Sequence, residues 1–500
     1  MLGSSRRRFM KSSAAVAAGF IGLKSACHPQ HAYAQGYDAE AAEYGYGYLF
    51  SDPKGILDLP KGFTYSIISQ KGDEMDDGLL VPGAPDGMAA LPGPYGLTVI
   101  IRNHELTPTD TGAFGEKRER LNKISKAMLY DPGLGDTPGA GGTSTIVYDT
   151  KTNTKIREFL SLAGTIRNCA GGPTPWKTWI TCEETVFRAG EHEDEENDNK
   201  KFQAEKDHGY NFEVPVSARM ELTEPIPLTD MGRFNHEAVA VDPRTGIVYQ
   251  TEDRDDGIFY RFLPTQPGNL KEGGKLQALV IKDKKSADTR NWKEWDKRAS
   301  GKTEEEKKKV PKRSTDDLIK DPVAVGQKFS VEWIDMDDVT SPEDDLRVRG
   351  FEAGAARFAR GEGIWYGNGE FFFACTSGGK ELIGQIWRYR PSYDEGTAQE
   401  KTSPGELELF IEPNDTNLVH NADNLTVSPW GDLIVCEDRD QQIIRLVGIT
   451  PEGKCYPFAM NHMRTEFAGV TFSPDGSTLF VNLQHSGHTV AIRGPWHKRA

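Results

Sequence analysis

Three adjacent acidic pairs stand at the ends of short apolar runs, and this pattern points to cation binding. They are Glu183 with Glu184, Glu252 with Asp253, and Glu437 with Asp438. Because neighbouring side chains of a β-strand point to opposite faces, one member of each pair can face a shared centre while the other meets a turn or an arginine. Clustered carboxylates need cations to stay ionised, and hard oxygen ligands select Ca²⁺ or another hard cation. One such pair would be an ordinary surface feature, but three in register favour a site.

Two copies of the tripeptide Asn-His-Glu supply further candidate ligands. Their carboxylates are Glu105 and Glu237, whereas each histidine alone is better explained as a strand cap than as a metal ligand. Asp423 and Asn424 add oxygen donors before another apolar run, where an ordinary turn satisfied by its own side chains is the alternative. The sequence therefore predicts that carboxylates from several strands meet at one metal site.

Arg360 and Glu362 flank Gly361, so an extended backbone would place both side chains on one face. A guanidinium grips phosphate or carboxylate with a planar pair of donors, and a nearby carboxylate can bind the metal that polarises the same group. Cys169 lies in a glycine-rich turn that can present its sulfur. Arg-x-Glu is a frequent motif and is weak evidence by itself. The acidic strand ends elsewhere in the chain are what favour a functional interpretation of Arg360 and Glu362.

Six apolar strands, each preceded by a turn, must position these groups. They cover residues 98–105, 178–184, 247–253, 371–377, 433–438 and 479–485. The fourth ends in Cys-Thr-Ser and the last in polar residues, whereas the other four end in acidic residues. Such a repeat predicts an all-β fold, a six-bladed β-propeller with the active site at its central axis. We expect residues 35–500 to form one domain, with charged insertions near residues 187–206, interpreted as a solvated acidic loop, and 271–320.

The formal net charge of −15 argues against a nucleic-acid partner, which would require a basic face. Residues 1–34 match a twin-arginine signal peptide, with Arg6 and Arg7, a short apolar stretch and a cleavage signal ending at Ala34. We therefore expect export by the twin-arginine machinery to the periplasm or the medium. No other segment is long and apolar enough to span a bilayer, so we expect no stable membrane association, and we expect a monomer.

The motifs resemble, in order and across nearly the whole mature chain, those of the PhoX alkaline phosphatases. The resemblance implies a six-bladed propeller that hydrolyses small phosphomonoesters with two Fe³⁺ and three Ca²⁺ ions. It rests on Arg102-Asn103-His104-Glu105, Asn168-Cys169-Ala170-Gly171-Gly172, Cys182-Glu183-Glu184, Asp207-His208-Gly209-Tyr210, Gly232-Arg233-Phe234-Asn235-His236-Glu237, Thr251-Glu252-Asp253, Arg360-Gly361-Glu362-Gly363, Asp423-Asn424, Glu466-Phe467-Ala468-Gly469 and Gly494-Pro495-Trp496.

The resemblance also implies roles for individual residues. Cys169, Glu237 and Glu362 correspond to iron ligands, and Arg360 corresponds to the residue that holds the phosphate, so Arg360, Glu362 and Cys169 are the implied catalytic set. The implied calcium ligands are Glu105, Glu183 or Glu184, Glu252, Asp253, Asp423, Asn424 and Glu437.

Two alternatives remain open from the sequence. A calcium-dependent propeller hydrolase of lactones or phosphotriesters also places carboxylates and asparagine around an axis, but it needs neither Cys169 nor Arg360. A secreted binding propeller with purely structural calcium is the other. Two departures from the family pattern stand out. Lys177 replaces the usual glycine of a turn and is interpreted as a surface change, whereas the shorter chain bears on the mouth of the pocket and hence on the substrate range.

Overall fold

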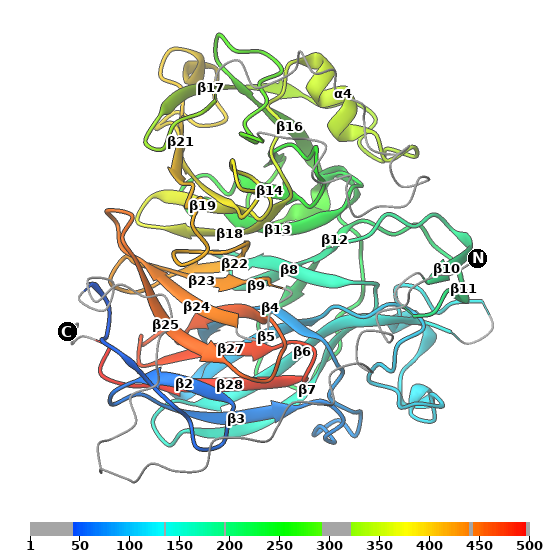
Figure 1. Ribbon diagram of the computed structural model, residues 1–500. Helices are drawn as coiled ribbons and strands as arrows, with labels where there is room; N and C mark the ends of the chain where they lie inside the picture. Colours follow the sequence, from blue (N-terminus) through cyan, green and yellow to red (C-terminus); the bar gives the residue numbers. More distant parts are fainter. Residues whose placement is uncertain (1–43, 135–136, 195–196, 293–321, 440–443, 497–500) are drawn as a thin grey trace, which may run out of the picture.

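The computed structural model describes residues 44–134, 137–194, 197–292, 322–439 and 444–496 (Figure 1). The expected signal at residues 1–34 lies outside these ranges. Strands dominate, and α4 (Leu346–Ala353) is the one α-helix within the described residues. Short 3₁₀ turns are η2 (Pro94–Gly96), η3 (Leu121–Lys123), η4 (Lys126–Met128), η5 (Thr229–Met231), η6 (Leu270–Glu272) and η8 (Ala398–Lys401).

The strands form antiparallel sheets that follow one another along the chain. The first contains β4 (Pro85–Pro92), β5 (Thr98–His104), β6 (Gly139–Asp149) and β7 (Thr154–Gly164). The second contains β8 (Asn168–Pro173), β9 (Thr178–Glu183) and β12 (Asn211–Pro215). Between β9 and β12 the chain forms a separate hairpin of β10 (Gly190–Asp194) and β11 (Lys200–Ala204).

A nine-stranded sheet follows. It contains β13 (His236–Val241), β14 (Val248–Glu252), β15 (Tyr260–Pro264), β16 (Gly274–Ile281), β17 (Lys328–Asp335), β18 (Gly361–Gly367), β19 (Glu370–Cys375), β20 (Gln385–Arg390) and β21 (Glu406–Ile411). Strand β17 pairs with both β16 and β21, and it thereby joins β13–β16 to β18–β21.

Two more sheets complete the arrangement. One contains β22 (Ala422–Val427), β23 (Leu433–Glu437), β24 (Ile444–Ile449) and β25 (Cys455–Asn461), to which β1 (Leu49–Phe50) and β2 (Leu57–Pro60) add. The other contains β26 (Phe467–Phe472), β27 (Thr478–Leu483), β28 (His488–Arg493) and β3 (Thr64–Gln70). Because β3 pairs with β28, a strand from each end of the described chain shares one sheet.

Six strands, which we call the inner strands, face the centre. These are β4, β8, β13, β18, β22 and β26, and each packs against the next, with β26 packing against β4. Small residues allow this close approach, because a Cβ atom on Gly87 would lie 2.5 Å from Ala170 Cα and one on Gly363 would lie 2.8 Å from Asn424 Cα. The arrangement is a β-propeller, which confirms the predicted all-β propeller class.

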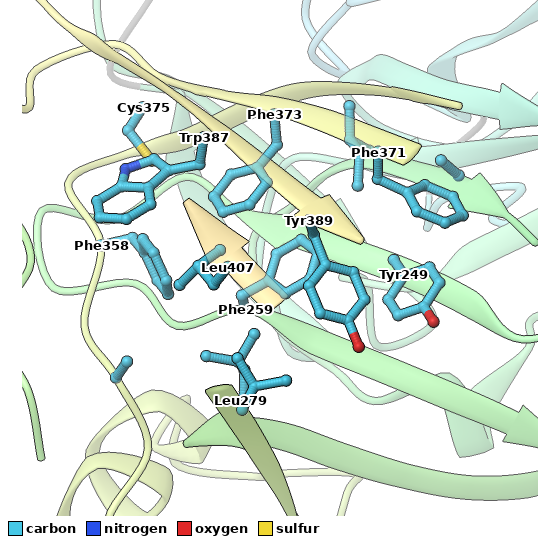
Figure 2. Packing of buried hydrophobic residues seen from close by; sticks show 14 of the residues in the cluster. Tyr249, Phe259, Leu279, Phe358, Phe371, Phe373, Cys375, Trp387, Tyr389 and Leu407 are labelled. Atoms are coloured by element: carbon cyan, nitrogen blue, oxygen red, sulfur yellow. The ribbon is translucent and has the colours of Figure 1, made fainter. Parts of the chain in front are cut away.

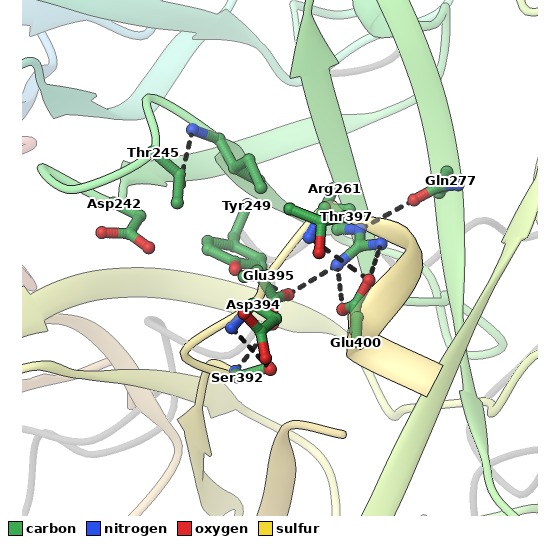
Figure 3. Close-up of polar contacts among 12 residues, drawn as sticks. Asp242, Thr245, Tyr249, Arg261, Gln277, Ser392, Asp394, Glu395, Thr397 and Glu400 are labelled. Carbon is green, nitrogen blue, oxygen red and sulfur yellow. Dashed lines mark hydrogen bonds and ion pairs between the residues drawn. The ribbon is translucent and has the colours of Figure 1, made fainter. Parts of the chain in front are cut away.

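A buried aromatic cluster and a polar network hold the nine-stranded sheet together. Figure 2 shows Tyr249, Phe371 and Tyr389 packed in this core. At its edge, Glu395 Oε1 accepts hydrogen bonds from Tyr249 Oη at 2.9 Å, Tyr389 Oη at 2.7 Å and Arg261 Nη1 at 2.6 Å. Figure 3 shows Glu395 beside Arg261. One carboxylate thus links β14 and β15 to β20.

The two predicted insertions differ from the sequence interpretation. Residues 187–206 include the β10–β11 hairpin rather than a wholly solvated loop, because the two strands pair and Asp194, Phe202 and Ala204 are buried. Strand β16 lies inside the interval 271–320 and pairs with β15 and β17, so the insertion begins after Ile281. Residues 293–321 lie outside the described part of the chain.

Candidate active site

One local pattern recurs at all six inner strands. The first residue of each inner strand pairs with the last residue of the strand that follows it, and the register then shifts at a β-bulge. Such a bulge re-aims the side chain beside it. The second residues of the inner strands form what we call the first series, namely Asp86, Cys169, Glu237, Glu362, Asp423 and Ala468.

A second series consists of the residues directly after the partner strands: Glu105, Glu184, Asp253, Thr376, Asp438 and Gln484. Their backbone N–H groups donate to the carbonyls of the residues directly before the inner strands, at 2.9–3.2 Å in all six places. Those acceptors, which we call the third series, are Ala84, Arg167, Asn235, Arg360, Asn421 and Glu466. The same backbone arrangement therefore occurs six times, and each copy places three side chains at equivalent positions.

The three series converge on a central cavity of about 910 Å³. Ten of the twelve first-series and second-series residues line it, the exceptions being Ala468 and Thr376. From the third series, Ala84, Arg167, Arg360 and Glu466 line it as well. Both arginines have a positive φ, 48° for Arg167 and 54° for Arg360, which is unusual for residues other than glycine and typical of functional sites.

Three overlapping groups in this cavity have the donor sets of metal sites. Within each group the ligand atoms lie within 4.8 Å of one another. The groups are Asp86, Glu105 and Cys169; Cys169, Glu184 and Glu237; and Glu237, Glu362 and Asp423. Asp86 Oδ1 and Glu237 Oε2 are buried without a hydrogen-bond partner, so these oxygens fit cation ligands better than structural acceptors.

Hydrogen-bond donors alternate with the carboxylates around the cavity wall. Gln484 Nε2 donates to Asp86 Oδ2 at 2.5 Å and to Glu105 Oε2 at 2.9 Å. Arg167 Nη2 lies 2.6 Å from Glu105 Oε1 and 2.7 Å from Glu184 Oε2. These donors fix the carboxylates in place before any ligand binds.

Arg360 adds a second guanidinium to this polar wall. Its Nε and Nη2 each lie 2.7 Å from an oxygen of Asp253, and Nη2 lies 2.9 Å from Glu362 Oε1. Although burial raises the pKa of Asp253, the Arg360 guanidinium outweighs it and lowers that pKa. The two carboxylates in turn hold the pKa of Arg360 well above its usual value, so the guanidinium stays charged.

Burial and mutual repulsion raise the pKa values of the first-series acids. Burial raises the pKa of Asp86 to about 7, despite the hydrogen bond from Gln484. Burial raises the pKa of Glu237 well above its usual value, and the charge of Glu362 raises it further. The pKa of the Cys169 thiol is likewise raised by burial and by the charges of Asp86 and Glu237. Only nearby positive charge would keep this set ionised at neutral pH.

Comparison with known proteins identifies the chain. A family model described as alkaline phosphatase PhoX matches residues 44–487. The chain belongs to this family. It is therefore an enzyme of the class that hydrolyses phosphomonoesters. No protein of the curated set matches the sequence.

Two solved structures give the extent of the structural similarity. PhoX of Pseudomonas fluorescens in complex with vanadate, a transition state analogue, has a TM-score of 0.60 at 17% sequence identity, over 88% of this chain and 96% of the other. That similarity supports the propeller fold of this PhoX-family chain. A gluconolactonase from Xanthomonas campestris has a TM-score of 0.34 at 12% identity, over 96% of this chain and 99% of the other.

The structure brings together most of the sequence-predicted site residues. Those that line the cavity are Cys169, Glu237, Glu362, Arg360, Glu105, Glu184, Asp253 and Asp423. Four predicted ligands lie outside its wall, namely Glu183, Glu252, Glu437 and Asn424. Asn424 accepts a hydrogen bond from Gly469 N and donates to Asp423 Oδ1, so it fastens β22 to β26.

Strand alternation explains the other three. Glu183, Glu252 and Glu437 are the last residues of their strands. Their side chains point away from the cavity, whereas the side chain of the next residue in each case points into it. Each has its own buried partner: His208 for Glu183 at 2.7 Å, Tyr260 for Glu252 at 2.9 Å and Arg445 for Glu437 at 2.8 Å. One member of each pair thus lines the cavity and the other lies behind it, as strand alternation allows.

The predicted site lacked several polar residues that line the cavity, among them Asp86, Glu466, Arg167 and Gln484, and it included Asp438 only as the neighbour of Glu437. Aligning the six repeats would have revealed them. Asp86 precedes Gly87 as Glu362 precedes Gly363, and Arg167 stands one residue before β8 as Arg360 stands before β18.

Proposed function

We propose that the central cavity hydrolyses phosphomonoesters to inorganic phosphate by metal-assisted transfer of the phosphoryl group to water. The observation that carries this proposal is the position of a charged guanidinium, Arg360, within a cavity whose wall is dominated by carboxylates and includes one thiol. Phosphoryl transfer needs positioned positive charge around the non-bridging oxygens, and it requires little covalent chemistry from the protein.

The residues present fit the two Fe³⁺ and three Ca²⁺ ions that the family resemblance implies. We assign iron to Cys169, Glu237 and Glu362, because a thiolate favours iron over calcium. We assign calcium to oxygen ligands among Asp86, Glu105, Glu184, Asp253, Asp423 and Asp438, in place of the predicted Glu183, Glu252, Glu437 and Asn424. When bound, such ions would offset the phosphoryl charge and lower the pKa of water.

Arg360 has the geometry to hold the substrate phosphate. Its Nε and Nη2 are engaged by Asp253 and Glu362, whereas Nη1 has no hydrogen-bond partner among the described residues. The side chain is 32% exposed, so a phosphoryl oxygen can reach it. The two carboxylates keep the guanidinium oriented, and it therefore donates to the phosphate without first reorganising.

We propose that the scaffold is a six-bladed propeller whose third and fourth blades are β13–β16 and β18–β21. The sixfold repeat of one backbone hydrogen bond supports this count, since each inner strand has its own copy. Strand β17 then bridges two blades at their outer edges. The charged insertions are extensions of this single domain.

We further propose twin-arginine export of a monomer to the periplasm or the medium, on the sequence of residues 1–34. Among the described residues, no helix is long and apolar enough to cross a membrane. Small phosphomonoesters are the substrates, and the net charge of −15 disfavours a nucleic-acid partner.

The test combines metal analysis with a substrate panel. Protein purified without added metal is expected to contain iron, and to release phosphate from monoesters in preference to diesters while leaving lactones intact. Arg360→Ala should keep its metals and lose about 10²–10³-fold in turnover, with partial rescue in Arg360→Lys, because lysine restores charge without the planar fork.

Arg349→Ala is a matched control, since this partly exposed arginine lies on α4 and pairs with Asp345. Lactone hydrolysis without phosphate release would refute the proposed function. Normal turnover and normal inhibition by phosphate in fully metallated Arg360→Ala would refute the role of Arg360.

A further inference from the structure

A second cavity of about 390 Å³ lies beside the central one. The two share Arg167 and Glu184, whose side chains line both. Ligand pockets in proteins typically begin at about 300 Å³, so this side cavity is large enough for part of a substrate. It therefore lies next to the place where the phosphoryl group reacts.

One wall of the side cavity is apolar and comes from the insertion at residues 187–206. Phe187 and Phe202 of the insertion line it, together with Val186 just before the insertion, and the two phenyl rings meet edge to face at 5.3 Å between their centroids. Phe202 is buried and packs with Ile166 and Ala204. The acidic insertion thus contributes aromatic surface to a cavity that borders the site.

The insertion is held firmly to the body of the enzyme. Phe187 O accepts hydrogen bonds from Arg233 Nη2 at 2.9 Å and from His208 N at 2.8 Å. At the end of β10, Asp194 Oδ2 accepts from Thr107 Oγ1 at 2.5 Å. The hairpin is therefore a fixed wall rather than a loose surface loop.

The opposite wall connects directly to the catalytic arginine. Arg254 and Asn235 line the side cavity, and Arg360 N donates to Arg254 O at 2.9 Å. Asn235 Nδ2 donates to Glu184 Oε1 at 3.2 Å. A group bound here would extend from a phosphate held by Arg360.

The charged groups of the side cavity largely satisfy one another. Arg167 is paired with Glu184 at 2.7 Å, and Asp194 accepts hydrogen bonds from two hydroxyls and from Asn197. The surface left for a ligand is the apolar wall and the flat face of the Arg254 guanidinium, whose Nη atoms are engaged by Asp344 at 3.7 Å and by Asp253 O at 3.2 Å. A guanidinium face stacks favourably on aromatic rings. A neutral planar ring fits this surface better than a second anionic group.

We propose that the side cavity binds the organic group of the phosphomonoester and selects esters that carry an aromatic ring. This inference rests on the proposed phosphatase function of the central cavity. Phe187 and Phe202 would contact the ring on one side and Arg254 on the other, while the phosphate occupies the central cavity.

The test compares 2-phenylethyl phosphate with ethyl phosphate, because both release a primary alkoxide and differ in the ring. In the wild type, kcat/KM for the ring ester should exceed that for ethyl phosphate by about tenfold or more, since even one methylene in an apolar pocket contributes about tenfold. Val186→Trp, which fills the cavity, and Phe187→Ala, which removes its apolar wall, should bring the ratio close to one. Both should leave ethyl phosphate turnover and inhibition by inorganic phosphate unchanged.

Tyr95→Ala is the control, because this ring is 99% exposed in a distant turn, and it should keep the wild-type ratio. A ratio near one in the wild type, or an unchanged ratio in both cavity variants, would overturn the proposal. Binding of 2-phenylethylphosphonate and ethylphosphonate, measured by calorimetry, separates the two hypotheses. If neither ester is hydrolysed, the phosphatase function fails, whereas equal binding of the two phosphonates refutes the aromatic subsite.

Discussion

His208 should make the stability of the enzyme depend on pH. The side chain is fully buried, with Nδ1 2.7 Å from Glu183 Oε1 and Nε2 3.1 Å from Asp131 Oδ2. Since both ring nitrogens face carboxylates, the imidazole is stabilised as a cation with both nitrogens protonated. Burial alone would lower the pKa of His208, but Glu183 and Asp131 outweigh it and raise that pKa to about 9.

The magnitude follows from the two protonation equilibria. The folded chain has a His208 pKa of about 9, against 6.5 for the ordinary side chain, and this difference corresponds to about 3 kcal/mol of folding free energy. Because the folded pKa is the higher one, this contribution is fully present below pH 6.5 and is lost as the pH rises through about 9. The free energy of unfolding should therefore fall across this interval.

Urea titrations of the metal-loaded protein at about pH 6 and about pH 10 would measure the effect. His208→Gln should be less stable than the wild type at the lower pH. The change in its free energy of unfolding between the two pH values should be smaller than that of the wild type by about 3 kcal/mol. His485→Gln is the matched control, because this histidine is 72% exposed. An equally steep pH dependence in wild type and His208→Gln would refute a buried imidazolium at this position.

Three further predictions concern the metals. Cys169→Ser should fold but lose iron and activity together, and elemental analysis beside phosphate release would test this; retained iron with normal turnover would remove Cys169 from the ligand set. Gln484→Leu removes the hydrogen-bond donor shared by Asp86 and Glu105. Half-saturation of the enzyme with Ca²⁺ should therefore need about tenfold more calcium. An unchanged calcium titration would contradict this positioning role of Gln484. Chelation should lower activity and melting temperature, with Ca²⁺ restoring both if iron stays bound. The metal-free protein should be less stable at pH 7 than at pH 4, since burial raises the pKa of Asp86 from 3.8 to about 7. A melting temperature that chelation leaves unchanged at both pH values would count against exchangeable calcium.

The sequence predicted the acidic strand ends well because their signal is local. An apolar run followed by two acids is visible without any knowledge of pairing, and alternation requires the two side chains to diverge. Which of the two faces the cavity is a non-local property. It depends on where the partner strand stops pairing. In the third repeat, for example, His236 pairs with Glu252 and the register shifts at the bulge directly after His236.

Two other features were beyond the sequence argument for physical reasons. Gln484 is a neutral amide and not a preferred metal ligand, so its role is visible only where it donates to two carboxylates from another blade. Strand β16 was assigned to an insertion because composition does not report pairing. Its apolar residues 278–281 pack in the sheet, although the charged residues that follow belong to the insertion.

The distribution of internal partners supports a cation centre more strongly than the number of acids does. Behind the cavity, Glu183 is paired with the His208 imidazolium and Glu437 is paired with the Arg445 guanidinium. These two carboxylates therefore have a cationic partner within the protein. In the cavity wall, eleven acidic side chains face three of lysine or arginine. Buried carboxylates without compensation would take up protons or force the wall apart. Arg167 and Arg360 pair with four of the cavity acids, whereas Asp86, Glu237 and Asp423 form no ion pair with a basic side chain of the described residues. The charge that remains in the cavity wall is therefore what metal ions would neutralise.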